Sequence, residues 1–461
     1  MKKLILSSVI CLVTLGVFAQ EQKEDGERYN QYGVKVNRQK LQAEERNGIL
    51  LEVFESLNQS YKFWFDIRVQ LDGAVFWGLD KDFDPIGNNV SVRRARFAVK
   101  AQINKNWYGE IDTDFSNGEF ELKDAIIEFT GLDNFSFKAG NFKEDFSMEQ
   151  TTSSRYLPFM ERPMVVQTFA PSRHLGIQAE YAKHWWRASF GVFFQAIDNL
   201  ETSTFVADNN KDYGRNQGMS YTGKVNFMPF SDDRTMGLHF GIAGSYRTPK
   251  TDVDPKDFGG SRFSSRNSTS INRKKYLDTD VIKDVKHDLL YGFELAGYKN
   301  GFRFQSELIG NNTKVKNTNA EYAGTHHFGG WYVMAGYLLF GGQQRFNNAE
   351  GEFTQPGRGK KWGDLEILAR YDYMDLNSRS IRGGSGENYT IGLNYYVNNS
   401  VKFVLNYQYS SNDRYANGKG KLIVGHDADG KPTADYTKVA AKKGKAGVNY
   451  SMLGLRMEID F

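Results

Sequence analysis

Leu453-Gly-Leu-Arg-Met-Glu-Ile-Asp-Phe461, at the carboxyl end of the chain, alternates strictly between apolar side chains and charged or small ones. Successive side chains of a strand point to opposite faces, so the apolar residues share one face and the charged residues share the other. In a membrane barrel the apolar face meets lipid and the other face meets a water-filled lumen. The stretch therefore predicts the closing strand of an all-β, transmembrane antiparallel β-barrel. A half-buried edge strand of a soluble sandwich is the alternative.

The amino end has the pattern of a secretory signal peptide, which we expect to span residues 1–19. Lys2 and Lys3 precede an uncharged apolar run over 4–17, and Ala19 ends a cleavage site of small residues. The run is too short to cross a membrane as a helix. Cys11, the single cysteine, lies within it. The mature chain is therefore expected to contain no disulfide, thiolate metal site or lipid anchor.

Alternation of apolar and polar residues divides the rest of the chain into two parts. Residues 20–59 are mostly polar and charged, and we expect a partly disordered periplasmic segment there. Residues 60–461 are expected to form the barrel; in 63–71, for example, apolar odd-numbered residues alternate with mostly polar even-numbered ones. At roughly 25 residues per strand and connection, this region would hold about 16 strands.

The connections between the expected strands are of two kinds. Short turns are expected at 131–134, 299–301 and 397–400, and long polar stretches occupy 248–287, 341–363 and 410–448. Outer-membrane barrels have short periplasmic turns and long extracellular loops, so we expect the two kinds at opposite rims. A soluble β-propeller would instead show repeats of blade length, which the sequence lacks.

Composition and charge narrow the classes of function. The formal net charge is +4, and loss of Lys2 and Lys3 with the signal peptide leaves about +2. Such a balanced chain is a poor candidate for a nucleic-acid-binding protein. Aromatic residues make up 14% of the sequence and glycine occurs 46 times. Barrels can have low hydropathy with many aromatic residues because only every second strand residue faces lipid.

A cationic run over Arg93–Lys100 is the strongest candidate for a functional motif. Alternation places Arg94, Arg96 and Lys100 on one face, and the residues between them are apolar. These cations must face the lumen, because a charge facing lipid at mid-bilayer costs about 2–4 kcal/mol. Guanidinium groups bind phosphate oxygens in pairs, so the run suits an anion path. Alternatively, its cations pair with acids on adjacent strands: Glu110, Asp112, Asp114, Asp124 and Glu128.

A mixed segment from Gly140 to Pro163 interrupts the alternation between two expected strands. In a barrel, such a segment is a candidate for folding inward to form a constriction. Lys143, Arg155 and Arg162 would then add to the cationic lining. An ordinary surface loop with solvated charges is the alternative.

Signals for other chemistry are weak. His326 and His327 are adjacent but have no further metal ligands at a suitable spacing, and the acidic stretch 427–435 lacks the spacing of a calcium loop. No serine lies in the context of a nucleophile elbow. We therefore expect no catalytic site, metal or cofactor.

The Arg93–Lys100 run resembles the phosphate-selective porins of the O/P family. The likeness continues, in the same order, through Asp124-Ala-Ile-Ile-Glu-Phe-Thr-Gly131, Gly140-Asn-Phe-Lys-Glu-Asp-Phe146, Thr152-Ser-Ser-Arg-Tyr-Leu-Pro-Phe159 and Ala369-Arg-Tyr-Asp-Tyr-Met-Asp-Leu-Asn377. The resemblance implies a trimeric, 16-stranded barrel in the outer membrane of a Gram-negative bacterium. It also implies a basic lumen with a narrow anion site.

Individual residues match the family's basic positions. The resemblance assigns lumen roles to Arg94 and Arg96, to Lys143 after the Gly-x-Phe pattern, and to Arg155 after Thr-Ser-Ser, and it matches Arg68 to an arginine of the first strand. It leaves open whether Asp114 or Asp124 corresponds to the acid of the central site. The near-neutral charge and the acids beside the arginines depart from a strongly basic pore.

The expected function is passive diffusion of small anions, with phosphate or polyphosphate as the leading candidates. Expected partners are outer-membrane lipid, such anions, two further copies of the chain, and the barrel-assembly machinery, which would bind at Phe461. A general or oligosaccharide-conducting porin with weak ion selectivity is one alternative. An outer-membrane enzyme or adhesin built on a barrel is another, but the sequence has neither a catalytic trio nor a large extra domain.

Overall fold

The computed structural model of the chain covers most of the expected barrel. Residues 28–29, 35–36, 51–56 and 59–460 are described, apart from 79–85, 104–105, 117, 119, 184, 195, 197–217, 232, 250–259, 272–274, 320–321, 414, 417–421, 424, 439 and 441–447. The expected signal peptide, most of the expected periplasmic segment and Phe461 lie outside these residues. In the described part, no helix is both long and apolar enough to cross a membrane.

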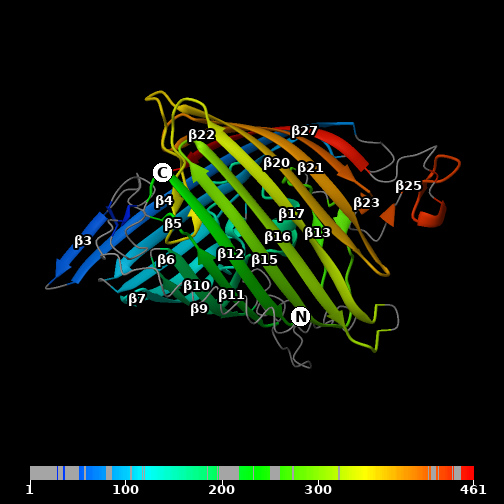
Figure 1. Cartoon of the computed structure of the whole chain (residues 1–461), viewed down its shortest axis with the longest axis horizontal. Helices are drawn as coiled ribbons and strands as arrows, with labels where there is room; N and C mark the ends of the chain where they lie inside the picture. Colours follow the sequence, from blue (N-terminus) through cyan, green and yellow to red (C-terminus); the bar gives the residue numbers. More distant parts are fainter. Residues whose placement is uncertain are drawn as a thin grey trace.

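A closed antiparallel barrel of sixteen strands, counted over the described residues, forms the body of the molecule (Figure 1). Each strand pairs with its neighbours in sequence, and the last strand pairs with the first, as in Leu455 opposite Gly73. The predicted all-β barrel is confirmed. The strands are β4 (Gln59–Trp77), β5 (Asn89–Ile103), β6 (Trp107–Asp114), β7 (Glu121–Leu132), β8 (Phe135–Lys143), β9 (Arg173–Ala182), β10 (Trp186–Phe193), β11 (Ser220–Phe227), β12 (Met236–Arg247), β15 (Val285–Lys299), β16 (Phe302–Val315), β17 (Gly324–Leu338), β20 (Asp364–Ser378), β21 (Ile381–Tyr396), β22 (Val401–Asn412) and β27 (Val448–Asp460).

Shorter elements lie in the connections or before the barrel. Strand β3 (Leu51–Ser56) pairs with the beginning of β4, next to the stretch of β4 that pairs with β27. In Figure 1, β3 lies at one end of the barrel and the β23 and β25 hairpins lie at the other. The remaining elements are β1 (Arg28–Tyr29), β2 (Lys35–Val36), β13 (Ser264–Ser265), β14 (Leu277–Asp278), β18 (Phe346–Asn347), β19 (Glu352–Phe353), β23 (Tyr415–Ala416), β24 (Leu422–Ile423), β25 (Gly425–His426), β26 (Pro432–Thr433), α2 (Met148–Thr151), α3 (Met164–Phe169) and η4 (Tyr436–Lys438).

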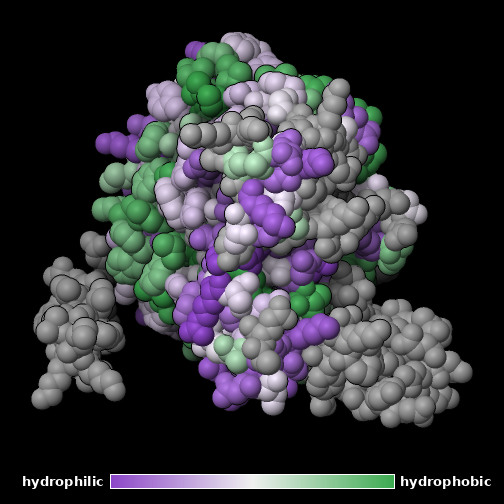
Figure 2. Space-filling model, turned by 90° about the vertical axis from the view of Figure 1, so that its right-hand side faces the viewer, coloured by the Kyte–Doolittle hydropathy of each residue, from purple (hydrophilic) through white to green (hydrophobic). Residues whose placement is uncertain are grey.

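The two faces of the closing strand have the predicted orientation. Leu453 and Leu455 are 40% and 52% exposed on the outer surface, whereas Arg456 is only 1% exposed inside the barrel. The same division recurs around the ring, for example at Ile127 and Ile242, which are exposed. Figure 2 shows apolar side chains along a flank of the barrel and polar ones across the end that faces the viewer. Apolar side chains thus face outward and charged side chains face the lumen.

The two rims of the barrel carry different connections. The short turns 133–134, 300–301 and 397–400 lie at the same rim as the end of β27, which is the periplasmic rim in outer-membrane barrels. The long connections 248–284 and 413–447 leave the opposite, extracellular rim. These placements agree with the expectation.

One long connection departs from the expected division of the rims. Residues 339–363 join β17 to β20 at the periplasmic rim, although they are as long as an extracellular loop. Strand order decides this, because the rim alternates with every strand of an antiparallel barrel. Length alone therefore gave the wrong rim for this segment.

Inward-folded loops fill one half of the lumen. The connection 144–172, between β8 and β9, crosses the barrel as predicted, and its apolar side chains pack on the inner wall from β12 to β20. Leu277, from the connection 248–284, joins the same cluster. The loop contributes Phe146, Phe159, Met164, Val165, Val166 and Phe169, and the wall contributes Ala243, Leu290, Ile309, Tyr332, Met334 and Leu368. Open space is therefore left mainly along the other wall.

Candidate pore chamber

A chamber of ≈ 250 Å³ lies between the inner wall of β4–β10, the crossing loop 144–172 and the β18–β19 hairpin. Its lining is densely charged and balanced in formal charge. Among the described residues, the lining contains eight cations, Arg68, Arg96, Lys100, Lys138, Lys143, Arg155, Arg173 and Arg187, and eight acids, Asp66, Glu110, Asp112, Asp124, Glu128, Asp145, Glu350 and Glu352.

The residues of β5 that line the chamber show where it lies along the barrel axis. Arg96, Ala98 and Lys100 line it, and they run from the middle of the strand toward the periplasmic rim. Arg94 is one inward position nearer the extracellular rim and donates from Nη1 to Oε1 of Gln70 at 2.6 Å. Two of the three cations predicted on this strand therefore reach the chamber, and Arg94 supports the wall above it.

A β-bulge turns Arg93 inward as well. The pairing of β5 with β4 shifts between Gln70 and Leu71, which leaves Arg93 without an opposite residue. Such a bulge re-aims a side chain that alternation would direct to lipid. Arg93 Nε lies 2.5 Å from Oε1 of Glu161 in the crossing loop. Burial alone raises the pKa of Glu161, but the charge and hydrogen bond of Arg93, together with the charges of Arg94 and Arg456, lower it by more, so the net pKa lies well below its usual value.

Arg68 and Arg155 join the wall to the crossing loop. Arg68 donates from Nη1 to Oγ of Ser154 at 2.6 Å. Arg155 forms an ion pair with Asp66 and lies 3.4 Å from Asp460, Nη1 to Oδ1. Both arginines keep part of their surface on the chamber. They therefore hold the loop and contribute positive charge to the lumen.

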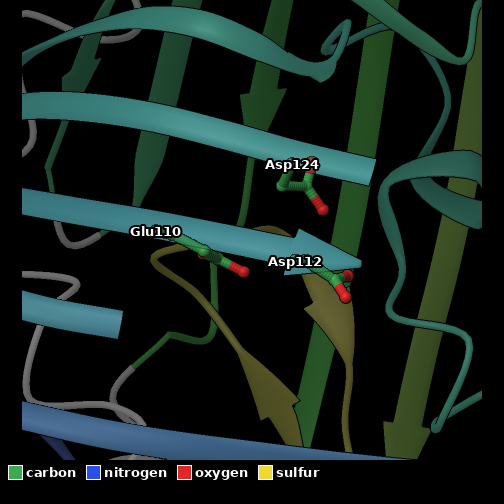
Figure 3. Close-up of side chains that lie close together, drawn as sticks. All are labelled: Glu110, Asp112 and Asp124. Atoms are coloured by element: carbon green, nitrogen blue, oxygen red, sulfur yellow. The ribbon is translucent and has the colours of Figure 1, made fainter. Parts of the chain in front are cut away.

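Three acids gather on the adjacent strands β6 and β7. Figure 3 shows Glu110 and Asp112 on one strand and Asp124 beside them on the next. A ligand oxygen from each lies within 4.8 Å of the others. Each acid also has a cation close by: Lys100 Nζ is 3.9 Å from Glu110, Arg96 Nη1 is 3.4 Å from Asp112, and Arg173 Nη2 is 2.5 Å from Asp124. The triad therefore belongs to an ion-pair network.

The two acids left open by the resemblance have different positions. Asp124 lines the chamber and receives two hydrogen bonds from Arg173. Asp114 lies at the extracellular end of β6, outside the described lining, with Oδ2 3.1 Å from Nε of Arg96. Asp124 is thus the acid that an ion in the chamber would meet.

Lys143 and Arg162 both contact the backbone of the crossing loop. Lys143 lines the chamber and donates from Nζ to the carbonyl oxygens of Thr151 and Thr152, at 3.0 and 3.2 Å. Arg162 donates from Nε to the carbonyl oxygen of Glu149 at 2.7 Å and lies outside the chamber lining. Arg162 therefore supports the loop from outside the chamber.

The ends of β8 and β9 break the alternation on which the sequence prediction depended. Gly140 has a φ of +133°, and a Cβ there would lie 1.9 Å from the carbonyl oxygen of Ala125. Beyond it, Phe142 and Lys143 both line the chamber although they are adjacent in sequence. Counting back from exposed Ile177 would place Arg173 on the lipid face, so alternation could not identify it.

Other lining residues had weaker or misleading sequence signals. Lys138 and Arg187 lie at inward positions of β8 and β10, and the alternation along each strand would have identified both residues. Glu350 and Glu352 lie on the segment whose length suggested the other rim. The chamber therefore combines residues from the wall, an extracellular loop and a periplasmic connection.

Comparisons with known proteins point to one family. The family described as Phosphate-selective porin O and P matches residues 63–428. Porin O of Pseudomonas aeruginosa is 23% identical over 402 residues, which cover 79% of this chain and 86% of that protein. An uncharacterized protein of Caulobacter vibrioides is 26% identical over 330 residues; the match covers 70% of this chain but only 63% of the relative.

A solved structure supports the fold independently. The outer membrane protein OmpT of Vibrio cholerae superposes with a TM-score of 0.50 at 12% identity, over 89% of this chain and 100% of that one. The family match extends over most of the barrel and includes most of the wall of the chamber. The chain therefore belongs to the phosphate-selective porin O and P family and is a channel-forming protein of the Gram-negative outer membrane.

Proposed function

We propose that this porin conducts small anions by passive diffusion, with phosphate as the leading candidate. The observation that carries the proposal is the set of arginines and lysines that line the chamber, among them Arg96, Lys143 and Arg173. Such side chains replace part of the hydration shell of an anion, and several weak sites in series let it leave again. Passage requires no covalent step, so we infer a channel and not an enzyme.

The acids of the chamber limit how strongly it attracts anions. Two unit charges 4 Å apart interact by about 4 kcal/mol at an effective dielectric constant of about 20. An arginine therefore attracts an anion substantially, and a carboxylate at a similar distance repels it by a similar amount. With equal numbers of both in the lining, we expect a modest preference for anions and weak binding.

Planar-bilayer measurements on Arg96→Gln and Arg173→Gln test the proposal. Each change removes one cation from the chamber, so the chloride-over-potassium permeability ratio in a KCl gradient should fall severalfold. Block of the chloride current by added phosphate should weaken in parallel. Lys360→Gln, at an exposed position of the periplasmic rim, is the matched control and should behave as the wild type. Unchanged reversal potentials in both chamber variants would refute the proposal.

A general or oligosaccharide-conducting porin remains the second candidate, favoured by the balanced charges of the lining. Liposome swelling separates the two functions. We expect faster swelling in isotonic phosphate than in a neutral disaccharide. Equal rates would favour the general porin.

The remaining expectations concern assembly and processing. We propose that residues 1–19 are removed on export, that 20–59 face the periplasm and that 60–461 form the membrane unit. We also propose a homotrimer whose assembly machinery binds at Phe461. Family membership supports these proposals. Amino-terminal sequencing of the mature protein and its mass in native detergent micelles are the measurements that check them.

A further inference from the structure

The periplasmic connection 339–363 folds up into the lumen as a hairpin. Its strands β18 and β19 pair with each other, and Gln343 bridges to Gly357 at the base. Phe353, only 1% exposed, packs beneath the guanidinium of Arg303, which lies 4.3 Å from the centre of its ring. Gln344 donates from Nε2 to Oε1 of Glu366 on β20 at 2.8 Å. The hairpin is thus a fixed part of the channel wall.

The tip of the hairpin brings two acids into the chamber. Glu350 and Glu352 both line it, and Gly351 between them has a φ of +69°. A Cβ on Gly351 would lie 2.7 Å from Nδ2 of Asn226 on β11 and 3.9 Å from Nη1 of Arg187 on β10, so the tip lies against these two strands. Glu350 and Glu352 share the chamber lining with Arg187 and Lys143, although Arg187 also pairs directly with Asp145 and Glu180. The two acids therefore add negative charge beside cations of the chamber.

These acids differ in origin from the acids on the strands of the wall. Asp112 and Asp124 are paired with arginines of the same wall. Glu350 and Glu352 come from a separate element that enters from the periplasmic side, and Lys143 and Arg187 come from the barrel. The hairpin therefore adds negative charge to the chamber from an element that is separate from the barrel strands.

We propose that the hairpin tip is a selectivity element: Glu350 and Glu352 partly neutralise Arg187 and Lys143 and so hold the anion preference of the channel below that of a purely basic pore. The inference rests on the proposed function as an anion channel. In formal charge, the described lining is neutral with the two acids and carries two excess positive charges without them. The acids would thereby weaken anion binding and favour release toward the periplasm.

The decisive experiment uses the full chain with Glu350→Gln and Glu352→Gln combined, in planar bilayers. The chloride-over-potassium permeability ratio should rise severalfold, and half-block of the chloride current should require less phosphate than in the wild type. Asp429→Asn, at an exposed turn of the extracellular connection 413–447, is the matched control and should change neither value. If the double variant does not assemble, Glu350→Gln alone is measured in the same way.

Two outcomes would overturn the inference: an unchanged permeability ratio in a variant of normal conductance, or a shift toward cations. A coupling test adds a second readout. Lys143→Gln should lower the ratio, and the decrease should be smaller in the wild type, where Glu352 partly neutralises Lys143, than in the Glu352→Gln background. The proposed function is judged separately, on the wild type. If the wild type shows no anion preference, that function fails, whereas a shift toward anions in the double variant would still support the role of the hairpin.

Discussion

At the scale of single residues, Arg93 and Glu161 connect the strand wall to the crossing loop. The Nε–Oε1 distance is 2.5 Å, and Arg456 lies 3.5 Å from the same carboxylate oxygen. Glu161 is 8% exposed, so loss of its charge would leave Arg93 without this carboxylate and Arg456 with Asp72 alone. Removing one partner of a buried pair typically costs about 3–5 kcal/mol. The loop should therefore loosen before the barrel does.

The depressed pKa of Glu161 gives this contact a defined pH dependence. Its native pKa lies below its unfolded value, because the combined attraction of Arg93, Arg94 and Arg456 outweighs the effect of burial. The stabilisation is complete above the ordinary carboxyl pKa of about 4.3 and is lost as the pH falls toward the native value. Open-channel current noise should thus be constant from pH 8 to pH 5 and rise in more acidic buffer.

Glu161→Gln supplies the comparison for that titration. The variant should be noisy already at pH 7 and change little on acidification. Glu121→Gln, which alters an acid paired with Lys123 at the beginning of β7, should titrate like the wild type. Equal noise in wild type and Glu161→Gln at every pH would contradict the assignment.

At the scale of elements, side chains of the wall satisfy the backbone of the crossing loop. A buried loop needs partners for its N–H and C=O groups. Asn406 Oδ1 accepts from the amide of Met160 at 2.8 Å, and Asn394 Nδ2 donates to the carbonyl oxygen of Pro158 at 2.8 Å. Asp372 Oδ1 accepts from the amide of Met164 at 3.1 Å. Polar side chains on the inner face of β20–β22 therefore provide hydrogen-bond partners for the backbone of the loop that covers them.

Phe159→Ala tests whether apolar packing keeps the loop across the lumen. Phe159 is 1% exposed and lies 4.5 Å beneath the guanidinium of Arg370. Truncation of a buried phenylalanine costs about 3–5 kcal/mol, and the strand ladder does not depend on it. Single-channel conductance should therefore rise and fluctuate while the barrel still forms.

The control for that prediction is a phenylalanine on the opposite face of the wall. Phe137 is 46% exposed on the outer surface, and Phe137→Ala should leave the conductance unchanged. A Phe159→Ala channel with wild-type conductance and noise would show that the loop is held by its hydrogen bonds alone.

At the scale of the whole molecule, ring closure and lumen filling divide the barrel into two halves. The half between β12 and β20 is occupied by apolar side chains of the loops, and the half along β4–β10 retains the charged chamber. Because cations and acids lie together along one wall, the lining of the chamber is balanced in formal charge. A narrow, balanced channel suits small ions better than large solutes.

Closure of the ring has its own test at Asp72 and Arg456. These residues are opposite each other where β4 meets β27, and their side chains form two hydrogen bonds of 2.7 and 2.8 Å. Asp72→Asn removes the carboxylate that receives both hydrogen bonds of the buried Arg456 guanidinium and leaves only the more distant Glu161, so the barrel should unfold at a lower temperature in detergent. The shift from folded to unfolded migration on a gel measures this.

The double variant Asp72→Asn/Arg456→Gln tests whether the two side chains stabilise the barrel as a pair or independently. It should recover part of the lost stability, because neither side of the closure then carries an unpaired charge. Additive losses would mean that the two side chains act independently.

The sequence by itself determined the barrel, its sidedness and five of the eight cations in the described chamber lining. The alternation of apolar and polar residues is a local property of the sequence, and it decides which face of a strand each side chain occupies. The outward position of Leu455 and the inward position of Arg456 could therefore be predicted. Alternation or the family resemblance identified five cations that line the chamber: Arg68, Arg96, Lys100, Lys143 and Arg155.

Only the tertiary structure decided the inward turn of Arg93 and Arg173, the position of Asp124 and the rim of the 339–363 hairpin. A one-residue bulge reverses parity without a clear mark in the sequence. The rim of a connection depends on the count of all preceding strands, and contacts between a loop and a distant wall depend on closure of the ring. Those features are set by long-range geometry, which a local pattern does not contain.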